Sequence, residues 1–344
     1  MSIIKDLIFE KISYEYKKPF HITNSVATHA NLINVKLVLK DGVVGLGQSA
    51  SSFRVNGEVI DGIINMKDAF LSEIEGMDVR NYRRVFDKID KFSRSAPSLK
   101  AAIQYSVLDA FSQEINTPVY QILGGKKDFV ETDLTISISS VEQTVKDAVE
   151  AYEAGFSTLK IKVGENLKTD IERMLGVYEA TKGTKYIVDA NLGYTPKEAL
   201  EFSRVMYSNG VPIEIFEQPV QVEDYDGLRF VRNRSNYPVG ADESIKTKFH
   251  ALRLIREECV DYINIKLMKA GISDALSIVE IAKTANISLM IGCMSESGIG
   301  VAQSVHFAAG TGAFTHHDLD SFLLLKNAPP VRFRNEGNKL YPTM

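Results

Sequence analysis

Residues 158–164 read Thr-Leu-Lys-Ile-Lys-Val-Gly, an apolar stretch that carries two lysines. Successive side chains of a β-strand point to opposite faces, so Lys160 and Lys162 share one face and the apolar residues share the other. Two neighbouring ammonium groups lower each other's pKa and burial lowers it further, which produces a base near neutral pH. A Lys-x-Lys pair on a half-exposed strand is more often a solvated face, so other residues must decide between these interpretations.

Composition places the chain among ordinary globular proteins. Its 344 residues are 44% hydrophobic and 24% charged, and the net charge of −4 indicates neither a nucleic-acid nor an acidic-membrane partner. No run approaches the ~18 apolar residues of a membrane span, and the N-terminus lacks the pattern of a signal peptide. The two cysteines, Cys259 and Cys293, form no disulfide framework. We expect a cytoplasmic protein, and self-association as a homo-oligomer stays open.

The N-terminal part is expected to be an α+β domain. Residues 1–50 alternate as antiparallel strands do, and Asn34–Leu39, a Lys-Asp-Gly turn and Val43–Gly47 form a hairpin pattern. Residues 58–115 change to helical spacing. We therefore expect a first domain at residues 1–125.

The next part of the chain alternates short apolar runs with helical stretches. Eight strands separated by helices over about 190 residues are what a parallel α/β barrel requires, and an open doubly wound sheet is the alternative. This barrel domain is expected at residues 126–320, and the tail at 321–344 is expected to return to the first domain. The expected strands are Leu134–Ile138, Thr158–Val163, Tyr186–Asp189, Ile213–Glu217, Val239–Asp242, Tyr262–Lys266, Ser288–Cys293 and Thr315–Asp320.

Three successive strands of this pattern end in a carboxylate, namely Asp189, Glu217 and Asp242. Chemistry in an α/β barrel sits at the carboxyl edge of the strands, where these side chains would converge. Three converging carboxylates repel one another unless a cation lies among them, and Mg²⁺ prefers such oxygen ligands. Each acid alone is more readily explained as a cap of the following helix, but three in succession predict a magnesium site.

Lys266 ends the sixth strand, on the far side of the barrel from Lys162. A substrate carbon held at the centre would then lie between two lysines. One base can remove a proton from one face while the other returns a proton to the opposite face, which inverts the carbon. A metal-bound carboxylate can accept the developing charge as an enediolate.

Together these segments resemble the enolase superfamily, its muconate-lactonising-enzyme subgroup, and most of all the dipeptide epimerases within that subgroup. The resemblance implies a modified (β/α)₇β barrel of the TIM type with an α+β capping domain, formed from the N-terminal region and the C-terminal tail. It rests on Lys160-Ile161-Lys162, Val188-Asp189-Ala190-Asn191, Phe216-Glu217-Gln218-Pro219, Ala241-Asp242-Glu243-Ser244 and Asn264 to Gly271.

The resemblance also implies roles for individual residues. Lys162 and Lys266 match the two acid/base lysines, and Lys160 matches the lysine that faces the substrate carboxylate. Asp318 and Asp320 match the pair that binds the N-terminal ammonium of a dipeptide, and period two places them on one face, with His317 on the other. The Mg²⁺ ligands would be Asp189, Glu217 and Asp242, and the residues that contact the dipeptide backbone would be Thr135, Met294, Ser295 and Glu296.

The pocket for the substrate side chain departs from the family pattern. Relatives specific for a Glu side chain carry an arginine in the first capping loop, whereas residues 20–26 contain none. Arg54 in the second loop could replace the missing arginine. The alternative is a pocket that is apolar or permissive. The expected pocket residues are Ile22, Asn24, Phe53, Arg54 and Val55.

The leading hypothesis is a Mg²⁺-dependent dipeptide epimerase, an isomerase that inverts the α-carbon of the C-terminal residue in L-Ala-D/L-Xaa dipeptides. Xaa would be Glu or, since residues 20–26 contain no arginine, a broad or hydrophobic set of side chains. The expected biological setting is murein-peptide recycling. A lyase or cycloisomerase, such as o-succinylbenzoate synthase or muconate cycloisomerase, could use the same lysines and metal. A barrel that binds ligands without turnover is the alternative outside enzymes.

Overall fold

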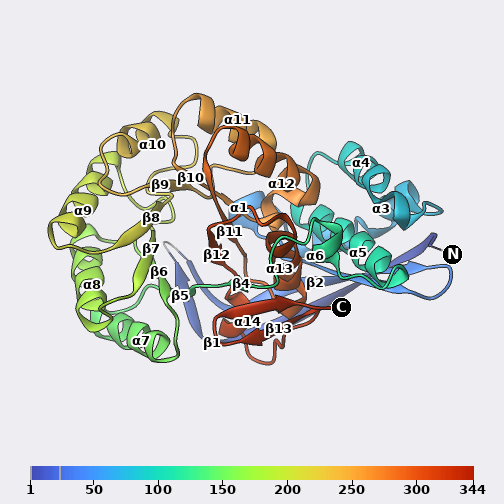
Figure 1. Ribbon diagram of the computed structural model, residues 1–344, viewed down its shortest axis with the longest axis horizontal. Coiled ribbons are helices and arrows are strands. Elements are labelled where there is room, and N and C mark those ends of the chain that lie inside the picture. Colours follow the sequence, from blue (N-terminus) through green and yellow to red (C-terminus); the bar gives the residue numbers. More distant parts are fainter. Residues whose placement is uncertain (1, 23–24) are drawn as a thin grey trace.

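The computed structural model describes residues 2–22 and 25–344. Figure 1 shows a ring of strands with helices around its outside, and beside this ring an antiparallel sheet with helices of its own. Within the described residues, no helix is long and apolar enough to cross a membrane. The expected architecture, a parallel α/β barrel with an α+β cap, is confirmed.

The cap is built on a three-stranded antiparallel sheet in the order β1-β2-β3. The predicted hairpin is present, since Leu37 pairs with Gly45 and Val38 with Val44 across the turn. A Cβ added at Gly47 would lie 2.1 Å from the backbone oxygen of Ala102, so helix α5 packs directly on the backbone of β3. The cap elements are β1 Ile4–Ile22, β2 Ser25–Leu39, β3 Val44–Ser49, α1 Phe53–Asn56, α2 Ile60–Ile64, α3 Lys67–Ile74, α4 Tyr82–Phe92, α5 Pro97–Glu114 and α6 Val119–Ile122.

The barrel consists of parallel strands in chain order, β5 to β12, with each strand paired to the next. All eight predicted strands are found, and their ends differ from the predicted ones by two residues at most. The strands are short apolar runs because both of their faces are buried. The outer face is covered by helices, and the inner face packs against side chains from the other strands of the barrel. The strands are β5 Leu134–Ile136, β6 Thr158–Lys162, β7 Lys185–Asp189, β8 Ile213–Glu217, β9 Val239–Ala241, β10 Tyr262–Ile265, β11 Ser288–Gly292 and β12 His316–Asp318.

One helix lies between each pair of successive strands, which gives the (β/α)₇β pattern (Figure 1). Gly271, with a φ of +71°, bends the chain inside α12, so this helix continues from a short turn directly after β10. The helices are α7 Val141–Glu153, α8 Leu167–Ala180, α9 Pro196–Ser208, α10 Tyr225–Arg232, α11 Lys248–Arg256, α12 Leu267–Thr284 and α13 Gly298–Thr311.

The first and last strands of the barrel meet at a seam. The backbone N–H of Asp133 donates to the backbone oxygen of His317 at 3.0 Å. The backbone N–H of Leu319 donates to Oγ1 of Thr132 at 2.9 Å. Among the described residues no continuous ladder joins β5 to β12, so individual bonds close the ring here.

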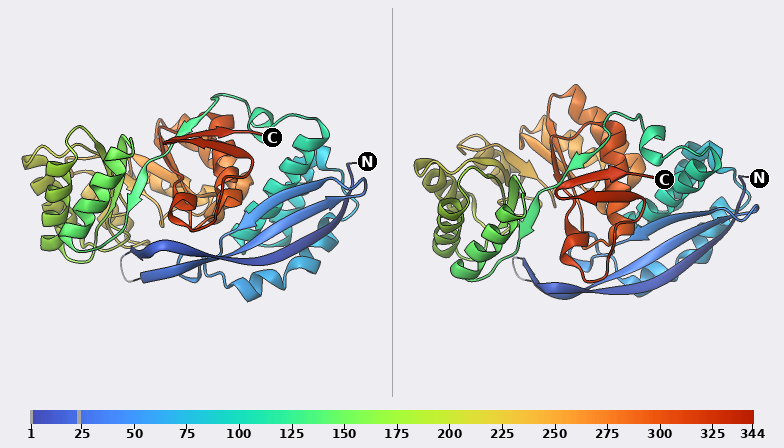
Figure 2. Two further views of the ribbon diagram at one scale, coloured as in Figure 1. Left: turned by 90° about the horizontal axis from the view of Figure 1, so that it is seen from below. Right: turned by 60° about the horizontal axis from the view of Figure 1, so that its bottom comes forward.

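The C-terminal tail runs along both parts of the molecule. After α14 Ser321–Leu324, the backbone N–H of Lys326 donates to the oxygen of Glu15 in β1 at 2.8 Å. The tail ends in a hairpin of β13 Phe333–Glu336 and β14 Lys339–Pro342, which pairs with β4 Val130–Glu131 just before the barrel begins. Figure 2 shows this hairpin against the barrel, while the long β1–β2 hairpin extends beneath it.

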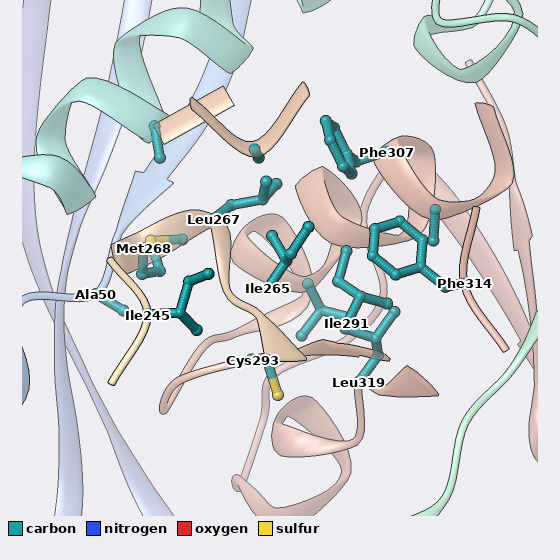
Figure 3. Close-up of a cluster of buried hydrophobic side chains, with 14 of the residues drawn as sticks. Ala50, Ile245, Ile265, Leu267, Met268, Ile291, Cys293, Phe307, Phe314 and Leu319 are labelled. Carbon is teal, nitrogen blue, oxygen red and sulfur yellow. The ribbon is translucent and has the colours of Figure 1, made fainter. Parts of the chain in front are cut away.

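Apolar packing joins the barrel to the cap. Figure 3 shows part of this buried cluster, in which Ile265, Leu267 and Ile291 lie beside Phe307 and Phe314. Side chains of this size stabilise a fold by about 1.5–3 kcal/mol each when fully buried. The same cluster includes Ala50, which directly follows β3 of the cap, so the barrel and the cap share one apolar core.

Candidate active site

Three carboxylates converge at the carboxyl edge of the barrel. Asp189 ends β7, Glu217 ends β8 and Asp242 directly follows β9. One oxygen from each lies within 4.8 Å of the others, and all three side chains are fully buried. Hard oxygen donors in this arrangement suit a divalent cation such as Mg²⁺.

The alternative role for these acids, as helix caps, does not apply. The N-cap of α9 is Thr195 and that of α11 is Thr247, and each accepts a hydrogen bond from the third helical residue. Asp189 instead accepts a bond from the backbone N–H of Asn191 at 2.9 Å. The acids are therefore available for a site at the centre of the ring.

Gln218 holds two of the acids in place. Its Oε1 accepts bonds from the backbone N–H groups of Asp242 and Ser244, at 2.9 and 3.1 Å. Gln218 has a φ of +37°, a left-handed conformation that is unusual for a residue with a side chain. Its bonds fasten the end of β8 to the end of β9, so the spacing between Glu217 and Asp242 is fixed by the fold.

Lys160 and Lys162 share one face of β6, as predicted, and both are buried. The Nζ of Lys162 lies 2.6 Å from Oδ2 of Asp189. The Nζ of Lys160 lies 2.8 Å from Oε2 of Glu217 and also 2.8 Å from Oδ2 of Asp318. Lys160 therefore connects the three-acid cluster with the end of β12.

Lys266 approaches the same cluster from β10, on the opposite side of the ring. Its Nζ lies 2.8 Å from Oδ2 of Asp242. A Cβ added at Gly292 would lie 2.9 Å from Cε of Lys266 and 2.9 Å from Oδ1 of Asn264, so only glycine leaves room for this side chain. Since β6 and β10 are four positions apart in a ring of eight strands, Lys162 and Lys266 face each other across the centre.

The expected fall in the pKa of Lys160 is wrong. Burial alone would lower the pKa of Lys160, but the carboxylates of Asp318, Glu217 and Asp189 outweigh burial and hold it well above its ordinary value. Burial also opposes the charged form of Lys266, and the Asp242 carboxylate again raises the pKa. The prediction counted like charges and burial but not the carboxylates that pair with each ammonium.

A cavity of about 330 Å³ lies between this edge of the barrel and the cap. Both Lys162 and Lys266 reach its wall, together with Thr135 of β5. Tyr16 of β1 donates a hydrogen bond to Oγ of Ser295 across the cavity, so cap and barrel are joined at its rim. The cap wall consists of Tyr16, Phe20, Ala27, His29, Ala30, Asn31, Leu32, Ala50, Ser51, Ser52, Arg54 and Val55.

Asp318 and Asp320 line another part of the cavity wall. Asp318 accepts a bond from Oγ1 of Thr135 at 3.3 Å, and Asp320 accepts one from the backbone N–H of Thr135 at 2.6 Å. His317 points the other way, where its Nδ1 lies 3.0 Å from the backbone oxygen of Glu131. The expected separation of these side chains is confirmed.

Only some of the remaining candidate residues line the cavity. Met294 and Ser295 line the cavity, whereas Glu296 lies behind it and accepts a bond from the backbone N–H of Met294 at 2.7 Å. Arg54 lines the cavity, but Phe53 is 75% exposed. Asn24 lies outside the described residues, as does the side chain of Ile22.

Sequence reasoning missed several residues of the site. Lys269, in the first turn of α12, donates from Nζ to both Oδ1 and the backbone oxygen of Asp242. Asn264 donates from Nδ2 to Oε1 of Glu217 at 2.6 Å. Period-two alternation places Asn264 beside Lys266, so this contact was readable from the strand pattern. That pattern cannot place Lys269, because it lies on a helix.

Family comparison agrees with this geometry. Residues 143–336 match the family described as enolase C-terminal domain-like, and residues 7–124 match the N-terminal domain of the mandelate racemase and muconate lactonizing enzyme family. The chain belongs to this family.

Its relatives include several dipeptide epimerases. The L-Ala-D/L-Glu epimerase of Thermotoga maritima is 55% identical over 95% of this chain and 94% of its own length. The hydrophobic dipeptide epimerase of Enterococcus faecalis is 36% identical over 95% of this chain and 92% of its own. A substrate-liganded complex of the Bacillus subtilis L-Ala-D/L-Glu epimerase has a TM-score of 0.96 at 33% identity, covering 99% of this chain and 96% of that one. The Enterococcus faecalis dipeptide epimerase, complexed with Mg and L-Leu-L-Tyr, has a TM-score of 0.94 at 34% identity, covering 99% and 97%.

Proposed function

We propose that this protein is a Mg²⁺-dependent dipeptide epimerase that inverts the α-carbon of the C-terminal residue in L-Ala-D/L-Xaa dipeptides. The observation that carries the proposal is the position of Lys162 and Lys266, which reach one cavity from opposite sides of the barrel beside a three-carboxylate cluster. The epimerases among its relatives support the same activity.

Asp189, Glu217 and Asp242 would hold the Mg²⁺. Their donor atoms are all carboxylate oxygens, and no cysteine or histidine belongs to this cluster. Bound there, the ion would supply positive charge that stabilises a substrate carboxylate as negative charge develops on it. Asn264 and Lys269, bonded to Glu217 and Asp242, would keep those two carboxylates oriented.

Lys162 and Lys266 would move the protons. One lysine, in its neutral form, takes the α-proton from one face of the carbon, and the other, as an ammonium, gives a proton to the opposite face. The carbon is thereby inverted with no net change in composition, and each direction of reaction uses the lysines in opposite roles. The rigid barrel holds both amines at fixed positions, as such a transfer requires.

Asp318 and Asp320 would bind the N-terminal ammonium of the dipeptide. Both carboxylates are buried, and both lie next to Thr135 at the cavity wall. A free ammonium can pair with them by charge-assisted hydrogen bonds. Lyase and cycloisomerase substrates of the same family lack an ammonium, which would leave two carboxylates near an anion, so the epimerase is favoured.

The C-terminal side chain of the dipeptide would face the cap. Phe20, Ala30, Leu32 and Val55 make this wall largely apolar, and Arg54 adds a single guanidinium. We infer a broad specificity that includes hydrophobic side chains, with Arg54 as the group that admits an acidic one. Murein-peptide recycling is the proposed setting.

The test is incubation of the protein with Mg²⁺ and a dipeptide library in D₂O, followed by mass spectrometry and chiral analysis. Epimerisation is expected to add one deuterium at the α-carbon of L-Ala-containing dipeptides. The variants Lys162→Ala and Lys266→Ala should abolish inversion, and each should leave exchange of one epimer only. Inversion that survives either change would remove the two-base assignment, and turnover of an N-succinylated or cyclic acid alone would favour the lyase.

A further inference from the structure

The structure brings a thiol into the proposed ammonium pocket. Cys293 follows β11, lines the cavity and lies at the edge of the apolar cluster in Figure 3. Its Sγ and one oxygen each of Asp318 and Asp320 lie within 4.8 Å of one another. A thiol and two carboxylates at this spacing are a ligand set separate from the three-acid cluster, and the thiol has no part in the proposed reaction.

Two further buried carboxylates, those of Asp133 and Glu296, interact electrostatically with these ligands from behind the cavity wall. Both oxygens of Asp133 are buried without a hydrogen-bond partner, and Asp133 is 2% exposed. Asp133 lies two residues before Thr135, which donates to Asp318 and Asp320, and its carboxylate interacts electrostatically with both of those aspartates. Oε2 of Glu296 is also buried without a partner. Lys160 is the ammonium that contacts Asp318.

The carboxylates of Asp318 and Asp320 disfavour the ionised forms of the acidic groups beside them, and a bound cation would remove this repulsion. Burial, followed by the carboxylates of Asp318 and Asp320, raises the pKa of the Cys293 thiol well above its usual value. Burial and the same two carboxylates raise the pKa of Asp133. A divalent cation would lower the pKa of both groups, because positive charge favours their ionised forms.

We propose that Cys293, Asp318 and Asp320 form a second cation site, which takes a thiophilic divalent cation such as Zn²⁺ and thereby blocks the position of the substrate ammonium. Zinc accepts thiolate and carboxylate ligands together, whereas Mg²⁺ avoids sulfur. Binding forms a metal–sulfur bond, and the thiol proton leaves to solvent. The inference that the cation blocks the substrate ammonium rests on the proposed function, whereas the metal site itself does not.

The metal site is tested with Cd²⁺, whose bond to a thiolate gives a charge-transfer absorption band in the ultraviolet. The full-length protein is first saturated with Mg²⁺, so that the three-acid cluster is occupied. The band is expected in the wild type and in Cys259→Ser, and is expected to be absent in Cys293→Ser. Cys259 is the matched control because it is the other buried cysteine and lies apart from both clusters. A band that persists in Cys293→Ser, or no band in the wild type, would overturn the site.

Asp133→Asn gives an independent check that leaves the ligands in place. Loss of its charge is expected to weaken Cd²⁺ binding by roughly tenfold, in the range found for groups next to metal ligands. An unchanged affinity would contradict the role given to the unpartnered carboxylate. Circular dichroism on each variant confirms that the fold is retained.

The blocking is tested separately with dipeptides. L-Ala-L-Phe is expected to displace Cd²⁺ and remove the band, and the N-acetylated dipeptide, which lacks the ammonium, is not. Zn²⁺ inhibition of epimerisation should be relieved by dipeptide and not by Mg²⁺. If dipeptides are not turned over, the band still reports the metal site. If L-Ala-L-Phe is turned over without displacing Cd²⁺, the overlap with the ammonium pocket is wrong.

Discussion

The ammonium of Lys269 bonds to both the carboxylate and the backbone oxygen of Asp242, and both side chains are buried. Lys266 contacts the other carboxylate oxygen of Asp242 at 2.8 Å. Asp242 is therefore held between two lysines, of which one reaches the cavity and the other does not.

Replacement of Lys269 by methionine is expected to destabilise the protein in the absence of divalent cations by about 3 kcal/mol, since a buried carboxylate loses its partner. Added Mg²⁺ should raise the melting temperature of this variant more than that of the wild type, because the ion restores the lost positive charge. Thermal unfolding with and without Mg²⁺ measures both effects. Lys283→Met, an exposed change in the same helix, is the control. A smaller Mg²⁺ effect in Lys269→Met would contradict this account.

Gly292→Ala is expected to reduce the rate of inversion by about 100-fold, because the new methyl group would displace Lys266 from its position. Binding of Mg²⁺, followed by calorimetry, should also weaken, because the methyl group would crowd Asn264, which bonds to Glu217. Gly62→Ala serves as the control, since its Cβ would meet only the side-chain end of Val59, at 3.2 Å. Wild-type kcat in Gly292→Ala would show that the close approach to Lys266 does not matter for catalysis.

Arg54→Ala is expected to lower kcat/KM for L-Ala-L-Glu by roughly 10- to 100-fold, the loss of one charge-assisted hydrogen bond. The value for L-Ala-L-Phe should stay within a factor of about two. Steady-state kinetics on both dipeptides, with Arg84→Ala as an exposed arginine control in the cap, measure the difference. Equal losses on both substrates would mean that Arg54 supports the loop rather than selecting the side chain.

Acid should destabilise the protein through His306. Burial lowers the pKa of this side chain from its ordinary 6.5 to about 4. Nδ1 accepts a bond from the backbone N–H of Tyr120 at 3.1 Å, and Nε2 lies 2.7 Å from the backbone oxygen of Arg332, so the neutral ring fits the site. Between pH 6.5 and about 4 this histidine is protonated in the unfolded chain but stays neutral in the folded one. The free energy of unfolding that is present above pH 6.5 is therefore lost as the pH falls to about 4.

The expected loss from His306 is about 3 kcal/mol over that interval. Urea unfolding at several pH values measures it. His306→Gln, which keeps a donor and an acceptor but does not titrate, should show a smaller fall in stability between pH 6.5 and 4. Parallel pH curves for the two proteins would assign the acid sensitivity to other groups.

The barrel was predictable because its signal is local. Short apolar runs alternate with helices, and Asp189, Glu217 and Asp242 stand at corresponding points of that repeat. Lys162 and Lys266 followed from the same strand positions. All of these residues can be placed by counting along a strand.

Other features depend on contacts that no local pattern contains. Gln218 fastens two strand ends through a left-handed backbone conformation, and Lys269 reaches Asp242 from a helix. The final hairpin pairs with β4 through Leu340 and Val130, which are 210 residues apart in the chain (340 − 130). The pKa of Lys160 depends on three carboxylates from three strands. Each is a consequence of tertiary structure.

The seam of the barrel is closed in part by residues that would also hold the substrate. Asp320 bonds to the backbone N–H of Thr135 at 2.6 Å, across the gap between the last strand and the first. Loss of this carboxylate would therefore weaken the cylinder as well as recognition, so inherited variation at Asp320 is constrained twice. A lineage that changes its substrate would have to find another way to fasten the ring before it could give up this residue.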